Sequence, residues 1–395
     1  MNIPFEVAKE KAYLVSTRRH LHQNPELSLK EFTTAAFIEQ QLDSFGITGR
    51  RVGGTGVLGV IDGGLGKGKT VLLRADIDAL PIEEENDTPY RSQTPGVMHA
   101  CGHDAHTAAL LGATKVLQAL KGTFAGRVLL VFQPAEEFGH GSRFFLAENI
   151  TAGVDRAFGL HVSPNFPVGT VAMTRGADAA SCDYFKITVH GKGAHISKPH
   201  QGIDALYIAS LIAAELKTLA KQVLDPSETA LIGVGKMLSG TSYNIIAEDA
   251  VLEGTTRTFS YEAQDLLKKE IAGLAERIAA EHGGRAVAEF ETFASALIND
   301  DDAYDEAYEI AVKLVGAENT VTDQAVIMGF GADDFSEYIR DTKGVYVHVG
   351  TASSTDPNTK NPLHSGSFDI NEQALLIGAS LHVEYTLSFL RREGL

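Results

Sequence analysis

The middle of the chain contains a run of alternating strands and helices that restricts the possible folds more than any other feature. Short strand-forming segments are separated by two long amphipathic segments, the second of which repeats leucine and isoleucine along one face and ends at Gly283-Gly284. The expected elements, in chain order, lie at 184–191, 203–221, 229–238, 251–259, 262–281 and 285–290. This β-α-β-β-α-β order predicts a domain of its own, covering residues 182–293.

The segments on either side of this block alternate in the way that is typical of an α/β domain. Strands are expected at 56–62, 70–76, 126–132, 156–162 and 344–349, and helices at 7–21, 28–45, 103–120, 301–314 and 372–391. Two domains are expected because 395 residues exceed the size that one hydrophobic core usually serves. We therefore predict an α/β domain formed by residues 1–181 and 294–395, interrupted by a ferredoxin-like α+β domain.

Two local signals mark the first helices. Asn24-Pro25 ends the first one, and Ser28 followed by Glu31 has the spacing of a capping box, which predicts that the second helix starts at Ser28. Between the two helices lies the charged stretch 18–26 (RRHLHQNPE). It has two interpretations, a solvated helix end or a functional segment, and the sequence leaves both open.

Residues 98–106 (MHACGHDAH) bring one thiol, three imidazoles and a carboxylate into nine positions. Cysteine and neutral imidazole are ligands that borderline divalent metals prefer, and Gly102 lets the backbone turn tightly between Cys101 and His103. Surface histidines beside a buried thiol are the simpler alternative. The density of donors favours half of a metal site.

Further donors follow the ends of predicted strands, where ligands usually bind in α/β sheets. The five metal-ligand candidates of the chain are Cys101, His103, Glu137, His161 and His364. They are too many for one tetrahedral ion with an open position, but they suit two ions that share a bridge and a water molecule. The thiolate favours zinc, with manganese or cobalt as alternatives. Glu136 is then free to act as general base, unless the glutamate pair is merely solvated.

Composition excludes several classes of partner. The formal net charge of −17 argues against nucleic acid and against an anionic membrane surface, since both select for basic patches. Nothing near the start has the basic and apolar regions of a secretory signal, and no apolar run approaches the ~18 residues of a spanning helix. Only Cys101 and Cys182 are present, which suits a reducing compartment. We expect a cytoplasmic protein.

Seven motifs together resemble the amidohydrolases of the M20 metallopeptidase family, in the branch of N-acyl-amino-acid, hippurate and auxin-conjugate hydrolases. They lie, in chain order, at 19–26, 74–81, 98–106, 133–137, 159–162, 191–200 and 361–365. The resemblance implies a dinuclear-metal exopeptidase-like catalytic domain, with the five donors above as ligands and Glu136 as base and proton shuttle. It also implies that the inserted domain is a lid through which two chains form a homodimer. His195 would then stabilise the oxyanion in the partner's active site, and Asn244 and Arg257 would hold the substrate carboxylate.

Two positions depart from the family pattern. Most related di-zinc peptidases have histidine where this chain has Asp76, so we expect Asp76, like Asp78, to lie behind the ligands and orient them. Asp333 stands where the branch usually has glutamate, which leaves the role of that loop open.

The expected activity is metal-dependent hydrolysis of the amide bond of N-acetyl or aromatic N-acyl amino acids. A dipeptidase of the same family would use the same chemistry with a different leaving group. A metal- or ligand-binding module without catalysis is the alternative from another class, although Glu136 beside the ligands argues against it.

Overall fold

The computed structural model describes residues 3–391, which divide into two compact units. The larger unit contains residues up to Asp178, Ile298–Met328 and the chain from Asp333 onward. The smaller unit contains Ala179–Leu297 and the short segment Gly329–Ala332. The predicted α/β architecture with an inserted α+β block is confirmed at the level of fold class.

The larger unit is built on an eight-stranded sheet in the order β1-β2-β4-β3-β5-β16-β6-β15. In that order the strands are Arg50–Val52, Gly56–Asp62, Arg127–Gln133, Thr70–Asp76, Arg156–Pro167, Gly344–Ala352, Val171–Ala172 and Thr320–Val321. The neighbours β4, β3, β5 and β16 run parallel, and most of their residues are buried. Because parallel strands end at the same edge, the residues that follow β3 and β4 come close together there.

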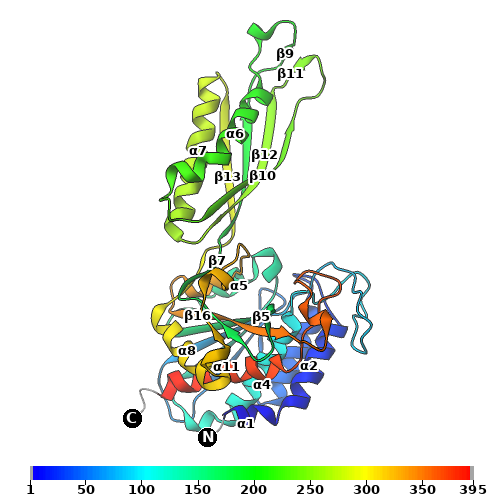
Figure 1. The fold of residues 1–395 in the computed structure, drawn as a ribbon, viewed down its shortest axis with the longest axis vertical. Helices are drawn as coiled ribbons and strands as arrows, with labels where there is room; N and C mark the ends of the chain where they lie inside the picture. Colours follow the sequence, from blue (N-terminus) through cyan, green and yellow to red (C-terminus); the bar gives the residue numbers. More distant parts are fainter. Residues whose placement is uncertain (1–2, 392–395) are drawn as a thin grey trace. The chain divides into compact units, whose positions relative to one another are not determined.

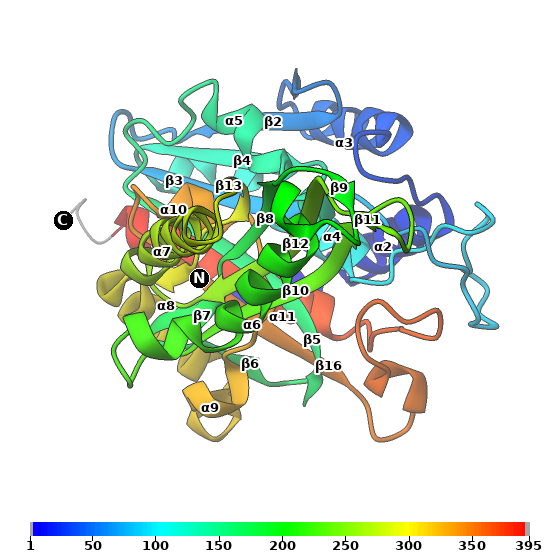
Figure 2. The same ribbon diagram turned by 90° about the horizontal axis from the view of Figure 1, so that it is seen from above.

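Helices pack against this sheet and form the rest of the larger core. They are α1 (Ile3–Ala8), α2 (Lys11–Gln23), α3 (Phe32–Ser44), α4 (His103–Ala119), α5 (Gly141–Leu146), α8 (Asp301–Val315), α9 (Gln324–Ile327), α10 (Ser336–Ile339) and α11 (Ala374–Arg391). Helix α4 lies between α2 and α11 and is buried along nearly all of its length, which explains its alanine-rich sequence (Figure 1). Helix α3 packs beside β2 (Figure 2).

The capping box predicted at Ser28 is wrong. Helix α3 begins at Phe32, and the side chain of Glu31 makes no capping hydrogen bond. The carboxylate of Glu26 caps this helix instead, because it accepts hydrogen bonds from the backbone N–H groups of Thr33 (3.1 Å) and Thr34 (2.8 Å). The predicted first helix is also divided, since α1 ends at Ala8 and α2 starts at Lys11.

The smaller unit has its own antiparallel sheet in the order β10-β12-β8-β13, with strands Ala230–Ser239, Asp249–Thr258, Cys182–His190 and Arg285–Ala294. Helices α6 (Ala205–Val223) and α7 (Tyr261–Glu281) pack against this sheet and bury a second hydrophobic core (Figure 1). A small two-stranded sheet pairs β9 (Ala194–His195) with β11 (Ile245–Ile246). Among residues 3–391, no helix has both the length and the hydropathy that crossing a membrane requires.

Candidate metal centre

A left-handed glycine separates the first two donors of the centre. Gly102 has a φ of 86° and immediately precedes α4, so that Cys101 lies before the turn and His103 begins the helix. A Cβ atom at Gly102 would lie 2.3 Å from Cγ2 of Val162, a distance that no side chain tolerates. Glycine is therefore required here both for the backbone angle and for the close approach of β5.

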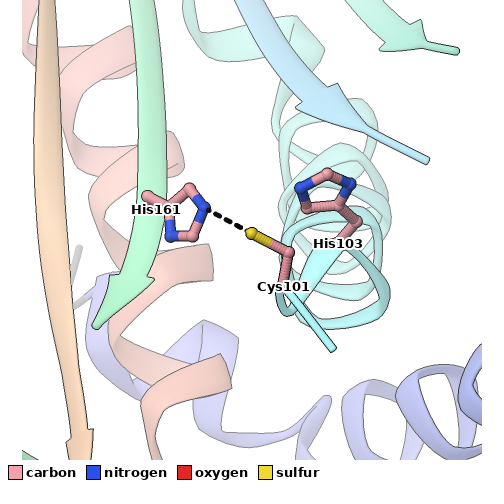
Figure 3. A group of neighbouring side chains, drawn as sticks. All are labelled: Cys101, His103 and His161. Carbon is pink, nitrogen blue, oxygen red and sulfur yellow. Dashed lines mark hydrogen bonds between the residues drawn. The ribbon is translucent and has the colours of Figure 1, made fainter. Parts of the chain in front are cut away.

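All five predicted ligands come together in the larger unit. Cys101, His103 and His161 form one group in which the ligand atoms lie within 4.8 Å of one another, and Cys101, Glu137 and His364 form a second. The Sγ atom of Cys101 lies 3.5 Å from Nε2 of His161, with His103 nearby on the first turn of α4 (Figure 3). Cys101 belongs to both groups, which suits two neighbouring ions that share a ligand.

The hydrogen bonds of His103 and His161 engage Nδ1 of each ring on the side away from Cys101, so that Nε2 of each ring lies on the side of the other donors. His161 donates from Nδ1 to the carbonyl oxygen of Val162 (2.6 Å), and His103 donates from Nδ1 to Asp78, to its carbonyl oxygen at 3.0 Å and to Oδ1 at 3.2 Å. Nε2 of His103 is buried and has no hydrogen-bond partner. Such a second-layer contact fixes the ring so that Nε2 can bind a metal.

The second group is completed from two loops. Glu137 lies in the single turn Glu136–Phe138 that follows β4, and its Oε1 is buried without a hydrogen-bond donor, 3.3 Å from Nε2 of His364. His364 is half-exposed and has a φ of 62°. Its backbone N–H bonds to the carbonyl oxygen of Ala100, which ties this loop to the Cys101 segment. The unpartnered atoms of His103 and Glu137, beside a thiol, fit a divalent cation.

Charge around the donors also favours a cation. Burial lowers the pKa of His103, but the negative charge of Asp76 and the hydrogen bond to Asp78 outweigh it and raise the pKa well above the usual value. The same carboxylates would attract a metal ion in place of that proton. Burial keeps the pKa of His161 well below its usual value, so this ring is neutral. Burial raises the pKa of the Cys101 thiol, which would need an adjacent cation to ionise.

Glu136 lies next to the ligand candidates His103 and Glu137. Its Oε2 is 3.9 Å from Nε2 of His103, and Glu136, Asp333 and Asp334 form a further group of neighbouring carboxylates. Burial, together with the charges of Asp333 and Glu137, raises the pKa of Glu136 well above its usual value. A carboxyl group with a raised pKa is suited to accept and return a proton near neutral pH.

Asp76 lies on the Nε2 side of His103 and forms a group of neighbouring donors with His103 and His106, whereas Asp78 bonds to the opposite ring nitrogen of His103. Oδ2 of Asp76 lies 2.5 Å from Nη1 of Arg74 and 3.8 Å from Nε2 of His103, while Oδ1 accepts a hydrogen bond from Nδ1 of His106 at 2.6 Å. Asp333 accepts hydrogen bonds from Tyr346 Oη and from the backbone N–H of Phe335, and it also pairs with Arg74 (3.1 Å). The Asp333 loop and Asp76 therefore share one guanidinium.

The charged stretch 18–26 is not a solvated helix end. Arg18 and His22 are fully buried, and both contact Oδ2 of Asp104, at 2.8 Å and 2.7 Å. Nε2 of His22 lies 3.2 Å from Glu84, and Arg18 also binds Asp369 at 2.8 Å. These pairs join α2 to the helix that carries His103, which the local sequence pattern did not reveal.

The smaller unit carries the remaining predicted residues. His195 is exposed on β9, and its Nδ1 accepts a hydrogen bond from the backbone N–H of Ser197 at 3.1 Å, so the proton of the neutral ring lies on Nε2. Asn244 immediately precedes β11, and its carbonyl oxygen accepts from the N–H of Ile196 (3.0 Å), which places it next to the His195 strand. Arg257 lies on β12, and its Nη1 is buried without a hydrogen-bond partner.

Comparison with known proteins identifies relatives of the whole chain. Residues 72–388 match the model of the peptidase family M20/M25/M40. The N-acetyl-L-cysteine deacetylase of Bacillus subtilis (strain 168) is 37% identical over 94% of this chain and 87% of its own. The IAA-amino acid hydrolase ILR1-like 4 of Arabidopsis thaliana is 34% identical, over 96% and 86%. The crystal structure of the Bacillus subtilis YXEP protein, described as a dinuclear metal binding peptidase from the M20 family, superimposes with a TM-score of 0.83 at 32% identity, covering 97% of this chain and 99% of that one.

Proposed function

The chain belongs to the peptidase family M20/M25/M40, and from that premise we propose that it hydrolyses the amide bond of N-acyl amino acids with the help of two divalent metal ions. The products would be a carboxylic acid and a free amino acid. The observation that carries the proposal is the position of Glu136 beside two overlapping groups of ligand candidates, in which Nε2 of His103 and Oε1 of Glu137 are buried without a hydrogen-bond partner. The similarity to an N-acetyl-L-cysteine deacetylase and to an IAA-amino acid hydrolase supports this substrate class.

The residues of the larger unit would have different roles in the hydrolysis of an amide. Divalent ions held by Cys101, His103, Glu137, His161 and His364 would supply a Lewis acid for the substrate carbonyl and make the attacking water more acidic. Zinc is favoured by the thiolate, with manganese or cobalt as alternatives. Glu136 takes the proton of the attacking water at its carboxylate and returns it to the leaving amine.

Residues of the smaller unit complete the proposal. The Ser197 N–H leaves the Nε2 proton of His195 free, so this ring can donate to the oxyanion, which we assign to the site of the partner chain in a homodimer. Strand β10 lies at the edge of its sheet and exposes Leu231 and Leu238, which supports dimerisation through this unit. Asn244 and Arg257 would hold the substrate carboxylate, and the two free cysteines fit a cytoplasmic location.

The first experiment measures amine release from N-acetyl, N-benzoyl and longer N-acyl amino acids, with dipeptides alongside. The protein is stripped of metal and refilled with zinc, manganese or cobalt. Glu136→Gln should keep its metal and lose turnover by about 10²–10⁴-fold, the usual contribution of a general base. Glu137→Gln is the matched control and should lose metal instead. Near-normal turnover of Glu136→Gln would contradict the proposal, and dipeptide cleavage alone would make the chain a dipeptidase.

The role of Arg257 is tested with the same substrates and their carboxamides. Arg257→Ala should raise KM for substrates with a free carboxylate and change KM little for the amides, because only the carboxylate matches the guanidinium fork. Arg285→Ala, at an exposed arginine on β13 of the same unit, is the control. Equal effects on acids and amides would show that Arg257 does not bind the carboxylate.

Light scattering of the same preparation measures whether the chain is a dimer.

A further inference from the structure

We propose that the segment Ser28, Leu29, Lys30 and Glu31, which we call the brace, positions both the base Glu136 and the ligands His103 and Glu137. The inference rests on the proposed function, since it assigns these three residues their roles. The brace lies in the larger unit just before α3, and its two polar ends both bond to the residues behind the metal centre.

Glu31 holds the turn that carries the base. Its side chain is fully buried, and Oε1 accepts a hydrogen bond from the backbone N–H of Ala135 at 3.0 Å, while Oε2 accepts from the hydroxyl of Thr55 at 2.7 Å. Ala135 directly precedes Glu136 and has a φ of 53°. A left-handed conformation is unfavourable for a residue with a Cβ atom, because that atom crowds the following carbonyl oxygen. The turn is thus held against its local preference, and Glu31 supplies a contact that holds it.

Ser28 holds the carboxylate that links the two ligands. Its hydroxyl donates to Oδ2 of Asp78 at 2.6 Å, and the same oxygen accepts from the backbone N–H of Glu137 at 3.2 Å. The other oxygen of Asp78 accepts from Nδ1 of His103. Asp78 therefore connects the His103 ring to the Glu137 backbone, and Ser28 limits the rotation of that carboxylate.

The backbone of the brace is itself constrained. Leu27 pairs with Ala79, and the N–H of Ala79 donates to the carbonyl oxygen of Glu26, so the chain before the brace is tied to the residue that follows Asp78. Leu29 has a φ of 65° although its side chain is 45% exposed, so apolar burial does not account for this conformation. Ser28 and Glu31, which flank this part of the brace, are both buried.

The start of α3 does not require these two side chains. Glu26 already caps the helix through the N–H groups of Thr33 and Thr34. Glu26 and Glu31 are thus two carboxylates of one loop that can be compared directly. Glu26 bonds to N–H groups of α3, and Glu31 bonds to the N–H of Ala135, which precedes Glu136. A purely structural role would make the two equivalent in their effect on catalysis.

The test compares Glu31→Met, Glu31→Gln and Glu26→Ala in the full chain. Glu31→Met should lower kcat at saturating metal by at least about tenfold, with KM nearly unchanged, and should weaken binding of Mn²⁺ to the metal-free protein by about tenfold in calorimetric titration. Glu31→Gln should restore most of both values, because its amide oxygen still accepts the Ala135 N–H. Glu26→Ala should lower Tm and leave kcat and Mn²⁺ affinity within about twofold.

If Glu31→Met does not fold, Ser28→Ala replaces it in the test, because this substitution removes only one hydroxyl group. Ser28→Ala should bind Mn²⁺ more weakly than the wild type. The proposed role of the brace would be overturned if Glu31→Met kept the wild-type kcat and Mn²⁺ affinity. If Glu31→Met does not fold, the same result in Ser28→Ala would overturn it. Equal losses in Glu31→Met and Glu26→Ala would overturn it as well, since they would indicate general loosening of the loop. If the wild type hydrolyses no substrate but Mn²⁺ affinity falls in Glu31→Met and recovers in Glu31→Gln, the brace stands and the proposed activity fails.

Discussion

The histidines near the centre differ in which ring nitrogen is already engaged. Nδ1 of both His103 and His161 faces a backbone carbonyl oxygen, which can only accept a hydrogen bond, and this leaves Nε2 for a ligand. His106 is different because its Nε2 accepts the N–H of Val162 (2.9 Å) and its Nδ1 donates to Asp76. Both nitrogens of His106 are therefore occupied, so this ring supports Asp76 and is unsuited to bind metal.

His382 gives a prediction for the dependence of stability on pH. This residue of α11 is buried, and neither of its nitrogens has a hydrogen-bond partner. Burial, with a contribution from His106, lowers its pKa to about 3 from the ordinary 6.5. The unfolded chain therefore binds a proton here between pH 6.5 and 3 that the folded chain does not, and stability is lost as pH falls through that window, by about 1.4 kcal/mol per pH unit.

His382→Leu should remove the pH-dependent contribution of His382 to the free energy of unfolding. The variant should therefore gain stability relative to the wild type as pH is lowered from 7 to 4.5. Urea unfolding of both metal-free proteins at each pH measures the difference in unfolding free energy, and any other group that titrates contributes equally to both. A difference that does not change with pH would mean that His382 is not buried in its neutral form.

At the scale of elements, the sequence predicts best those helices and strands whose pattern of apolar residues is local. The parallel strands β3 and β4 are apolar runs, and the carboxylates at or just after their ends follow from the rule that ligands bind at that edge. The strand predicted to end at residue 162 instead continues to Pro167, so His161 lies inside β5 and not at its end. The donor cluster at 98–106 can likewise be recognised from nine consecutive residues. The long central elements β3, β4 and α4, and the donors beside them, were therefore predictable from local sequence, whereas the division of the first helix and the start of α3 were not.

Segments whose partners are distant in sequence were not predictable in this way. Ser28 and Glu31 have the spacing of a capping box, but their partners Asp78 and Ala135 are 50 and 104 residues away. Arg18 and His22 look like a solvated helix end until Asp104, more than 80 residues later, is placed beside them. In each case a buried tertiary hydrogen bond outweighs the local preference, and no pattern within one helix encodes it.

At the scale of the whole molecule, each unit has a hydrophobic core and a sheet of its own. The ligand candidates lie only in the larger unit, whereas His195, Asn244 and Arg257 lie in the smaller one. The energetic effect of a metal ion should therefore be confined to one core, because an ion stabilises only the folded structure that binds it.

Removal of metal with a chelator should consequently act on one unit. Hydrogen exchange should speed up in the first turn of α4, in the turn Glu136–Phe138 and in the loop around His364, because carboxylates and unpartnered donors crowd there without a cation. Strands β8, β12 and β13 of the smaller unit should keep their protection. None of the five ligand candidates lies in these strands or in their core, so the strands serve as the internal control in the same experiment. Faster exchange in both units alike would show that the chain unfolds as one cooperative body, and unchanged exchange around all five donors would show that they hold no structural metal.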